Sequence, residues 1–202
     1  MTPPRRKRRS QRVERRTVLL VTNGRVTEDA YLRQLCRRVN HDGISAKVKV
    51  IKGDPLTVVK QLGGPRSDLS EYEEVWIVVD HDGRDRHDFL AKCRRLSSKR
   101  TVVHGVVSVP CFEVWLNAHY APVKNYQNQA DAQAHYRELT GLSSKDSKML
   151  PDDLPWDRGV QAAARCHLPM DGLPEPDTQG PCPSTTMPHL LRSLGLLSAD
   201  DL

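Results

Sequence analysis

The sequence lacks the cysteine patterns that would indicate a disulfide framework or a structural zinc site. Its five cysteines are an odd number, lie far apart and include no Cys-x-x-Cys pair: Cys36, Cys93, Cys111, Cys166 and Cys182. Disulfide-rich domains pair their cysteines, and structural zinc sites take their ligands from closely spaced ones. We therefore expect reduced thiols, most of them buried.

Long apolar segments are also missing. No run approaches the ~18 residues of a membrane-spanning helix, and the arginine-rich start has no apolar segment of the kind that a secretory signal needs. There are no internal repeats. With 202 residues, one domain with an elaboration is the expected organisation, and a chain of this length can bury a substantial core. These features predict a cytoplasmic protein with no membrane segment.

Positive charge is concentrated at the N-terminus. Residues 1–16 hold eight Lys and Arg, among them Arg5, Arg6, Arg8 and Arg9, against Glu14 alone, which gives a net charge of +7. The whole chain carries +6, so residues 17–202 sum to −1. We expect a disordered basic tail that binds nucleic-acid phosphates or another acidic partner through salt-sensitive contacts. The alternative is a solvated tail that only improves solubility.

Strand and helix patterns alternate over residues 17–121. The segments with the composition of strands are 17–21, 46–51, 75–79 and 101–109. The second alternates Lys with Val and Ile, which is typical of a sheet edge. Apolar residues at helical spacing occur over 27–39, 55–62, 85–96 and 111–120. This order favours βαβ units, so we expect an α/β core over residues 17–121, with a mostly parallel sheet flanked by helices.

The pattern changes beyond residue 121. Helical patterns cover 125–139, 156–167 and 188–197, and a predicted loop at 169–183 contains five prolines and two glycines. We expect residues 122–202 to form a mainly helical C-terminal extension packed on the core. Ser184, Thr185 and Thr186 precede its last helix, where capping is favoured over phosphate binding.

The most informative segment is an apolar run that ends in two carboxylates. Val75 to Val79 has the composition of a buried parallel strand, and Asp80 and Asp82 follow it. In extended backbone, residues two apart point to the same side, and two like charges held so close favour a cation between them. Oxygen ligands at the carboxyl end of a strand suit Mg²⁺ or Mn²⁺. The segment predicts a metal site at Asp80 and Asp82, the alternative being residues that only form the turn.

Two other sites with closely spaced aspartates do not match. An EF-hand would have a third oxygen ligand at position 84 and glycine at position 85, where the chain has Arg84 and Asp85. An Asp-x-Asp-x-Thr phosphatase would have threonine in place of Arg84.

Three segments with candidate chemistry each follow a predicted strand: the turn after 17–21, the Asp80 pair and Glu113. A parallel sheet brings these strand ends to one rim. Glu113 lies in an otherwise apolar run, where a carboxylate needs a cation or a hydrogen-bond network, or else interacts with the dipole of a helix start. We expect Glu113 either to complete the metal site or to play that helix-start role.

At these positions the chain resembles the RloB-like family. Residues 21–31 are similar to the glycine-containing opening of that family, and residues 75–82 to its Asp-x-Asp strand. The segment Val109-Pro-Cys-Phe-Glu-Val-Trp-Leu116, followed by His119, resembles its most specific motif. Pro-Ser-Thr-Thr at 183–186 resembles its C-terminal signature, so the resemblance extends over residues 17–197.

The resemblance implies a Toprim-like βαβ core that binds Mg²⁺ or Mn²⁺ and acts on nucleic-acid phosphodiesters. It also implies a place in bacterial anti-phage defence, with an ATPase of the defence system as a possible partner. The sequence is compatible with an oligomer.

One position departs from the Toprim pattern, which has Glu just before the glycine of the first motif. The chain has Asn23 before Gly24, and an amide cannot shuttle a proton at neutral pH. Glu28 is a candidate replacement, or only a favourable charge in the first turn of a helix. We expect Asn23, Gly24 and Arg25 to contact phosphate.

Three functions are compatible with these features. The first is a metal-dependent nuclease, in which Asp80, Asp82 and Glu113 hold the metal and, with Glu28, are the catalytic residues. The second is a Toprim-like module that binds nucleic acid or a partner without cleaving, which Asn23 favours. The third is a metal-dependent phosphatase or nucleotide-processing enzyme.

Overall fold

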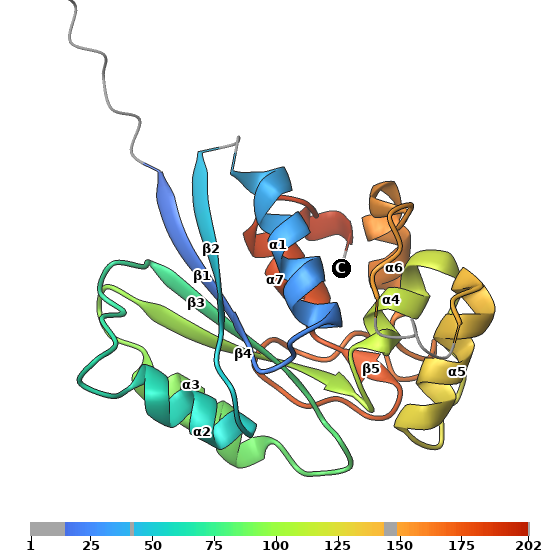
Figure 1. The fold of residues 1–202 in the computed structure, drawn as a ribbon, viewed down its shortest axis with the longest axis horizontal. Helices are drawn as coiled ribbons and strands as arrows, with labels where there is room; N and C mark the ends of the chain where they lie inside the picture. The colour runs from blue at the N-terminus through green and yellow to red at the C-terminus, as the bar shows by residue number, and fades with distance from the viewer. Residues whose placement is uncertain (1–14, 41–42, 144–148, 202) are drawn as a thin grey trace, which may run out of the picture.

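A five-stranded sheet forms the centre of the molecule (Figure 1). The computed structural model describes residues 15–40, 43–143 and 149–201. The strands are β1 (Arg16–Thr22), β2 (Ile44–Val50), β3 (Glu74–Asp80), β4 (Val102–Val109) and β5 (Ser184–Thr185), in the order β2-β1-β3-β4-β5. The first four are parallel and β5 is antiparallel to β4. The predicted α/β class, the mostly parallel sheet and the edge position of β2 are confirmed.

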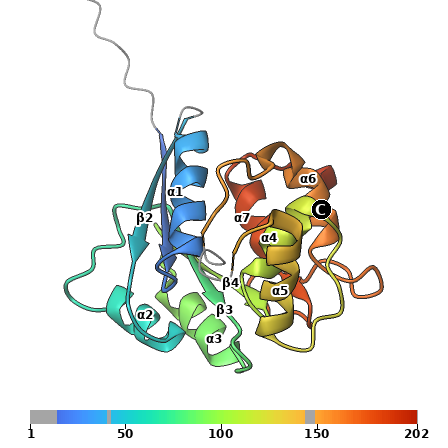
Figure 2. The ribbon, with the colours of Figure 1, turned by 45° about the vertical axis from the view of Figure 1, so that its right-hand side comes forward.

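Helices cover both faces of the sheet (Figures 1 and 2). Helices α2 (Pro55–Leu62) and α3 (His87–Leu96) pack on one face. Helices α1 (Thr27–Val39), α4 (Glu113–Tyr120) and α7 (Met187–Ser193) pack on the other. Helices α5 (Gln129–Thr140) and α6 (Gly159–Arg165) pack against α4, and the short 3₁₀ helices η1 (Trp156–Arg158) and η2 (Ala199–Asp201) complete the set.

Alternate strand residues pack on opposite faces of the sheet. Leu20 and Trp76 belong to the core on the α1 face, whereas Leu19, Val21 and Ile77 belong to the core on the α2 face. Because both faces are buried, the central strands are continuous apolar runs rather than alternating ones. This explains why the strand ends carry the few polar residues that can face a ligand.

The C-terminal helices continue the core of the α1 face, since Tyr126, Tyr136 and Leu190 belong to the same cluster as Leu32 and Trp115. The mainly helical C-terminal region that the sequence predicted is therefore confirmed. None of the described helices is long and apolar enough to cross a membrane.

A buried hydrogen-bond network joins α4 to α5. Asn117 donates from Nδ2 to the hydroxyl of Tyr126 (2.9 Å) and to the carbonyl of Ala132 (3.0 Å). The Tyr126 hydroxyl lies 2.7 Å from Nδ1 of His135. Hydrogen bonds between buried polar groups favour one arrangement of the helices. The position of α5 is thereby tied to that of α4, whose first residue is Glu113.

The C-terminal chain also closes the β4 edge of the sheet. The backbone N–H of Gly105 donates to Oδ1 of Asp177 (2.7 Å), and Nδ1 of His104 lies 2.9 Å from Oδ2 of the same residue. Further along, Ser184 and Thr185 form β5. A two-residue strand leaves no periodic pattern, which is why the sequence analysis missed it.

The Ser184 to Thr186 segment is buried, and its hydroxyls are used within the fold. Oγ1 of Thr185 accepts from the backbone N–H of Met187 (3.3 Å), the first residue of α7, but Thr186 occupies the cap position and its side chain makes no capping hydrogen bond, so the predicted cap is wrong. Oγ1 of Thr186 instead accepts from the backbone N–H of Val107 (3.2 Å). At α1, Thr27 is the first helical residue and Val26 occupies the cap position.

All five cysteines are free thiols, as expected. Cys36, Cys93, Cys111 and Cys166 are buried, and Cys182 is exposed.

Candidate functional site

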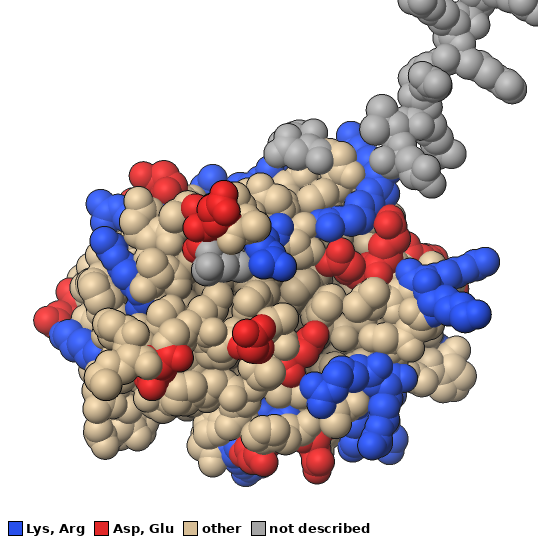
Figure 3. Space-filling view, turned by 180° about the vertical axis from the view of Figure 1, so that it is seen from behind, with Lys and Arg blue, Asp and Glu red and all other residues tan. Residues whose placement is uncertain are grey.

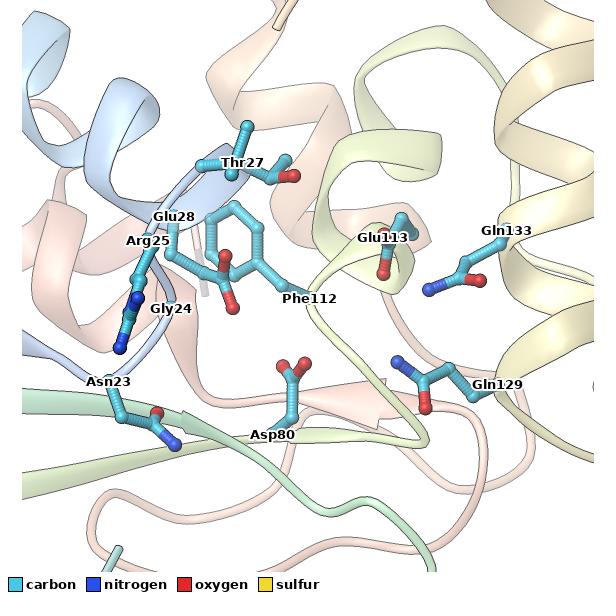
Figure 4. Close-up of a pocket in the computed structure, with 11 residues that line it drawn as sticks. Asn23, Gly24, Arg25, Thr27, Glu28, Asp80, Phe112, Glu113, Gln129 and Gln133 are labelled. Atoms are coloured by element: carbon cyan, nitrogen blue, oxygen red, sulfur yellow. The ribbon is translucent and has the colours of Figure 1, made fainter. Parts of the chain in front are cut away.

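A cavity of about 410 Å³ lies at the carboxyl ends of β1 and β3 (Figure 4). Asp80 is the last residue of β3, Glu28 is in the first turn of α1, and Glu113 is the first residue of α4. The three predicted segments therefore meet at one rim. The lining residues are Asn23, Gly24, Arg25, Val26, Thr27, Glu28, Asp80, Phe112, Glu113, Gln129 and Gln133. We call this space the Asp80 cavity.

Asp80 supplies a buried carboxylate oxygen to the cavity. Its Oδ1 is inaccessible to solvent and has no hydrogen-bond partner among the described residues. Burial, followed by the charges of Glu28, Glu113 and Asp82, raises the pKa of Asp80 well above its usual value. A desolvated carboxylate beside other carboxylates is stabilised by a proton or by a cation.

Glu28 folds back over the turn that precedes α1. A Cβ atom at Gly24 would lie 2.1 Å from Cδ of Glu28 and 2.2 and 2.3 Å from its two carboxylate oxygens. Cβ atoms do not approach other atoms so closely, so the carboxylate occupies the space that any side chain at position 24 would need. The glycine of the first motif thus allows Glu28 to reach the cavity from the next helical turn.

Asn23 lines the cavity but also has a role in the fold. Its Nδ2 donates to the carbonyl of Gly53 (3.1 Å), which ties the end of β1 to the loop after β2. The exposed side chain of Arg25 lies next to it along the cavity wall (Figure 4). Phosphate contact by Asn23, Gly24 and Arg25 stays a prediction. Arg5, Arg6, Arg8 and Arg9 lie outside the described residues.

Asp82 lies in a neighbouring space. Strand β3 ends at Asp80, and Asp82 has a φ of 50° within the turn that follows. Its side chain is 46% exposed, and its Oδ2 lies 3.7 Å from Nη2 of Arg86. It lines a second cavity of about 360 Å³ with His81 and Cys182. The extended backbone expected through Asp82 is therefore wrong, and its role as a metal ligand stays a prediction.

Glu113 lies in the first turn of α4 and also lines the Asp80 cavity, so both of its expected roles stay predictions. It is only 4% exposed, so its carboxylate is largely withdrawn from water. A buried carboxylate at this place needs a compensating group, and the start of a helix supplies part of that compensation.

Two glutamines that the sequence analysis missed form the wall contributed by α5. Gln129 and Gln133 are one helical turn apart, so they share a face of the helix. In Figure 4 both side chains extend into the cavity, and Gln133 points toward Glu113. The one sequence signal was a polar pair at i, i+4, which is common on exposed helix faces.

The donor atoms of the cavity suit a hard divalent cation. Asp80, Glu28 and Glu113 offer carboxylate oxygens, and no thiol or imidazole lines the cavity. Among the described residues, no group of three or more His, Cys, Asp or Glu is arranged to hold an ion. Mg²⁺ does not need such a cage, because one or two carboxylates usually hold it and water completes its shell. The unpartnered Oδ1 of Asp80 makes this carboxylate the best candidate for direct contact.

A model of the RloB-like protein family matches residues 18–194. The chain belongs to the RloB-like protein family. The match runs from β1 into the residue after α7, so it includes every residue that lines the Asp80 cavity. No curated protein and no solved structure gives a significant match.

Two further residues of the family motif lie in the core of this RloB-like protein. The Cys111 thiol is buried, and burial followed by the charge of Glu113 raises its pKa well above the ordinary value. His119 is 1% exposed, and its Nδ1 lies 3.2 Å from the carbonyl oxygen of Pro155. Its ring contacts Trp115 edge-on at 4.9 Å between centroids. Both residues have structural environments, and the burial of Cys111 agrees with the expected buried thiols.

His119 is expected to make this RloB-like protein sensitive to acid. Burial lowers the pKa of His119 to about 4, below the 6.5 of a free histidine. The neutral ring therefore stabilises the fold above about pH 6.5, and this contribution is lost as the pH falls toward 4. At 1.36 kcal/mol per pH unit, the loss is about 3 kcal/mol.

Urea unfolding across this range should show a shallower pH dependence of the unfolding free energy for His119→Gln than for the wild type. The matched control is His87→Gln, whose ring is 73% exposed, and equal slopes for all three proteins would contradict the assignment.

Proposed function

We propose that this RloB-like protein is a metal-dependent nuclease that hydrolyses nucleic-acid phosphodiesters at the Asp80 cavity. The observation that carries the proposal is the buried, unpartnered Oδ1 of Asp80 beside the carboxylates of Glu28 and Glu113. The Toprim-like character and the anti-phage role are supported by the resemblance of residues 21–31, 75–82 and 109–116. An ATPase partner has the same support.

The proposal assigns a role to each wall of the cavity. Asp80, with Glu28 or Glu113, would hold Mg²⁺ or Mn²⁺, which offsets negative charge on a phosphate and activates water for attack. Without a cation these carboxylates repel a phosphodiester, so binding and metal loading are coupled. The carboxylate that does not contact the ion is the group available to accept a proton.

The neutral and cationic residues would orient the substrate. The amides of Gln129 and Gln133 offer hydrogen-bond donors without adding charge, and Arg25 offers a guanidinium at the mouth of the cavity. Asp82, bound to Arg86 in the next turn, lies near enough to contribute to the field at Asp80.

The test is cleavage of labelled single-stranded and duplex DNA and RNA by the full chain with Mg²⁺, Mn²⁺ or EDTA. We expect cleavage of at least one polymer with metal and none with EDTA. Glu113→Gln, which keeps the shape of the side chain, is expected to slow cleavage by about 100-fold. A rate that Glu113→Gln leaves unchanged would point to a contaminating nuclease.

Two outcomes would replace the proposal. Release of phosphate from mononucleotides, with no cut in any polymer, would indicate a phosphatase or nucleotide-processing enzyme. Retained binding with no cleavage in any metal would indicate the non-cleaving module, which Asn23 favours because an amide stands where the Toprim pattern has Glu.

A further inference from the structure

A second concave surface lies between α2 and α3, on the opposite face of the sheet from α1. It is a groove of about 550 Å³ lined by Asp54, Leu56, Thr57, Val59, Lys60, Gly63, Lys92, Arg95 and Leu96. Leu96 packs closely against Gly63 within the groove, since a Cβ atom at position 63 would lie 2.8 Å from Cδ2 of Leu96. We call this surface the α2/α3 groove.

The groove belongs to the most positive segment of the folded body. Residues 84–100 hold seven Lys and Arg against two Asp, a net charge of +5. Residues 17–202 sum to −1, so the rest of the body carries −6. Figure 3 shows Lys and Arg side chains gathered toward the lower right of the face drawn, where the α2 and α3 layer lies when Figure 1 is seen from behind. The net positive charge of the folded body is therefore concentrated in this segment.

Three cations converge on the groove. Lys92 and Arg95 lie three residues apart on α3, on the side facing α2, and Lys60 faces them from α2. All three are exposed, and no ion pair to them is found in the described parts of the chain. By contrast, Arg94 turns away and donates to the carbonyl of Asp177 (3.2 Å).

The single acidic residue of the groove is already engaged. Asp54 accepts from the backbone N–H of Thr57 (3.0 Å) and from its hydroxyl (2.9 Å), and these bonds lower the pKa of Asp54. It acts as the cap of α2. The net field in the groove is consequently that of Lys60, Lys92 and Arg95.

The lining distinguishes between modes of binding. No aromatic ring lines the groove, so it offers no platform on which bases would stack. Exposed Lys and Arg side chains bind the phosphates of nucleic acid irrespective of sequence. The groove therefore suits a phosphodiester backbone rather than a base edge.

Both helices of the groove begin near the rim where Asp80 lies. Helix α3 begins seven residues after Asp80, and Arg86 fixes the intervening turn by donating from Nε to the carbonyl of Asp80 (2.8 Å). The starts of α2 and α3 both follow strand ends on the rim where Asp80 lies. Asp54, the cap of α2, lines the groove at this end, so the groove begins at the same sheet edge as the proposed nuclease site, which favours nucleic acid over an acidic polypeptide as the occupant.

We infer that the α2/α3 groove binds the phosphate backbone of a nucleic acid. The inference rests on the proposed function for the identity of the ligand, but it is tested by binding alone. Single-stranded and duplex nucleic acids carry the same phosphate groups for these cations to bind, so the experiment compares both.

The experiment measures the salt dependence of binding of fluorescein-labelled single-stranded and duplex oligonucleotides to the full chain in EDTA. The groove variant is Lys60→Gln/Lys92→Gln/Arg95→Gln. Loss of three phosphate contacts should reduce the slope of log K against log[salt] by about 2 for a single strand and about 3 for a duplex. The matched control is Arg37→Gln/Arg158→Gln/Arg192→Gln, which removes the same charge from exposed residues of α1, η1 and α7 and should leave the slope close to the wild-type value.

Several outcomes would overturn the inference. Equal slopes for the two triple variants would show that only net charge matters, and unchanged nucleic-acid binding with lost poly-glutamate binding would identify an acidic polypeptide as the occupant. Cleavage by the wild type with no effect of the groove variant would refute the groove alone. Groove-dependent binding without cleavage in any metal would refute the nuclease alone. If the triple variant fails to fold, Lys92→Glu serves in its place, with an expected slope change of about 1.

Discussion

Asp80→Asn is expected to abolish cleavage while making the metal-free protein more stable. Asparagine keeps the shape of the side chain but removes a desolvated charge that lies beside Glu28 and Glu113. Its Nδ2 would also give the neighbouring carboxylates a donor. We expect cleavage to fall by about 1000-fold or more and the Tm in EDTA to rise by about 2–4 °C, the shift that 1 kcal/mol produces in a chain of this size.

The pH dependence of this stabilisation has a defined sign. Because the pKa of Asp80 is raised in the folded state, the protonated carboxyl stabilises the fold below the usual pKa near 4, and this is lost as the pH rises through the raised value. The Tm difference between Asp80→Asn and the wild type should therefore be small near pH 4 and grow toward neutral pH. Differential scanning fluorimetry over a pH series measures it.

Asp82→Asn is the matched control, since the two aspartates have the same chemistry and lie two residues apart. Asp82 is 46% exposed and lies near Arg86, so its replacement should keep cleavage near the wild-type rate and should not stabilise the protein. Mg²⁺ should raise the Tm of the wild type and of Asp82→Asn, but not that of Asp80→Asn. A destabilised Asp80→Asn, or equal loss of cleavage in both variants, would contradict the assignment of the Asp80 cavity.

Gly24→Ala is expected to impair cleavage as much as Glu28→Gln does. The added methyl group would occupy the space of the Glu28 carboxylate and drive it from the cavity. Both single variants should lower kcat by about 100-fold, and the double variant should be no worse than either, because both remove the same group. The cleavage rates of the wild type, the two single variants and the double variant form a double-mutant cycle, and they are measured under single-turnover conditions with the preferred polymer at saturating metal.

Asn23→Ala is the control for this cycle. It removes the hydrogen bond to Gly53, which contributes about 1 kcal/mol, and leaves the Glu28 carboxylate in place. We expect a lower Tm with kcat reduced less than tenfold. Multiplicative losses in the Gly24 and Glu28 double variant would show that the glycine acts independently of Glu28. A larger loss in Asn23→Ala than in Glu28→Gln would return the functional role to position 23.

Much of the fold follows from local patterns. The central strands and the helices from α1 to α7 lie close to the expected positions, because burial on one or two faces imposes a period on the sequence. The meeting of Gly24, Asp80 and Glu113 at one rim was also predictable, since parallel strands place their carboxyl ends together.

Side-chain direction at the strand ends was not predictable in the same way. Asp82 follows Asp80 by two residues, but its own backbone is not extended, with a φ of 50°, and the expected pair is divided between two cavities. Glu28 reaches the Asp80 cavity because Gly24 has no side chain to occupy that space. The periodic patterns that predict helices and strands do not reveal such a fit between two residues.

By itself, the sequence determined the α/β class, the RloB-like family and the segments that carry the candidate chemistry, because periodicity and motifs are local properties of the chain. Only the tertiary structure decided that Asp80, Glu28 and Glu113 share a cavity with Gln129 and Gln133, and that Lys60 faces Lys92 and Arg95. These juxtapositions depend on how the helices pack on the two faces of one sheet. The position of α5, for example, depends on the hydrogen bonds of Asn117 between α4 and α5.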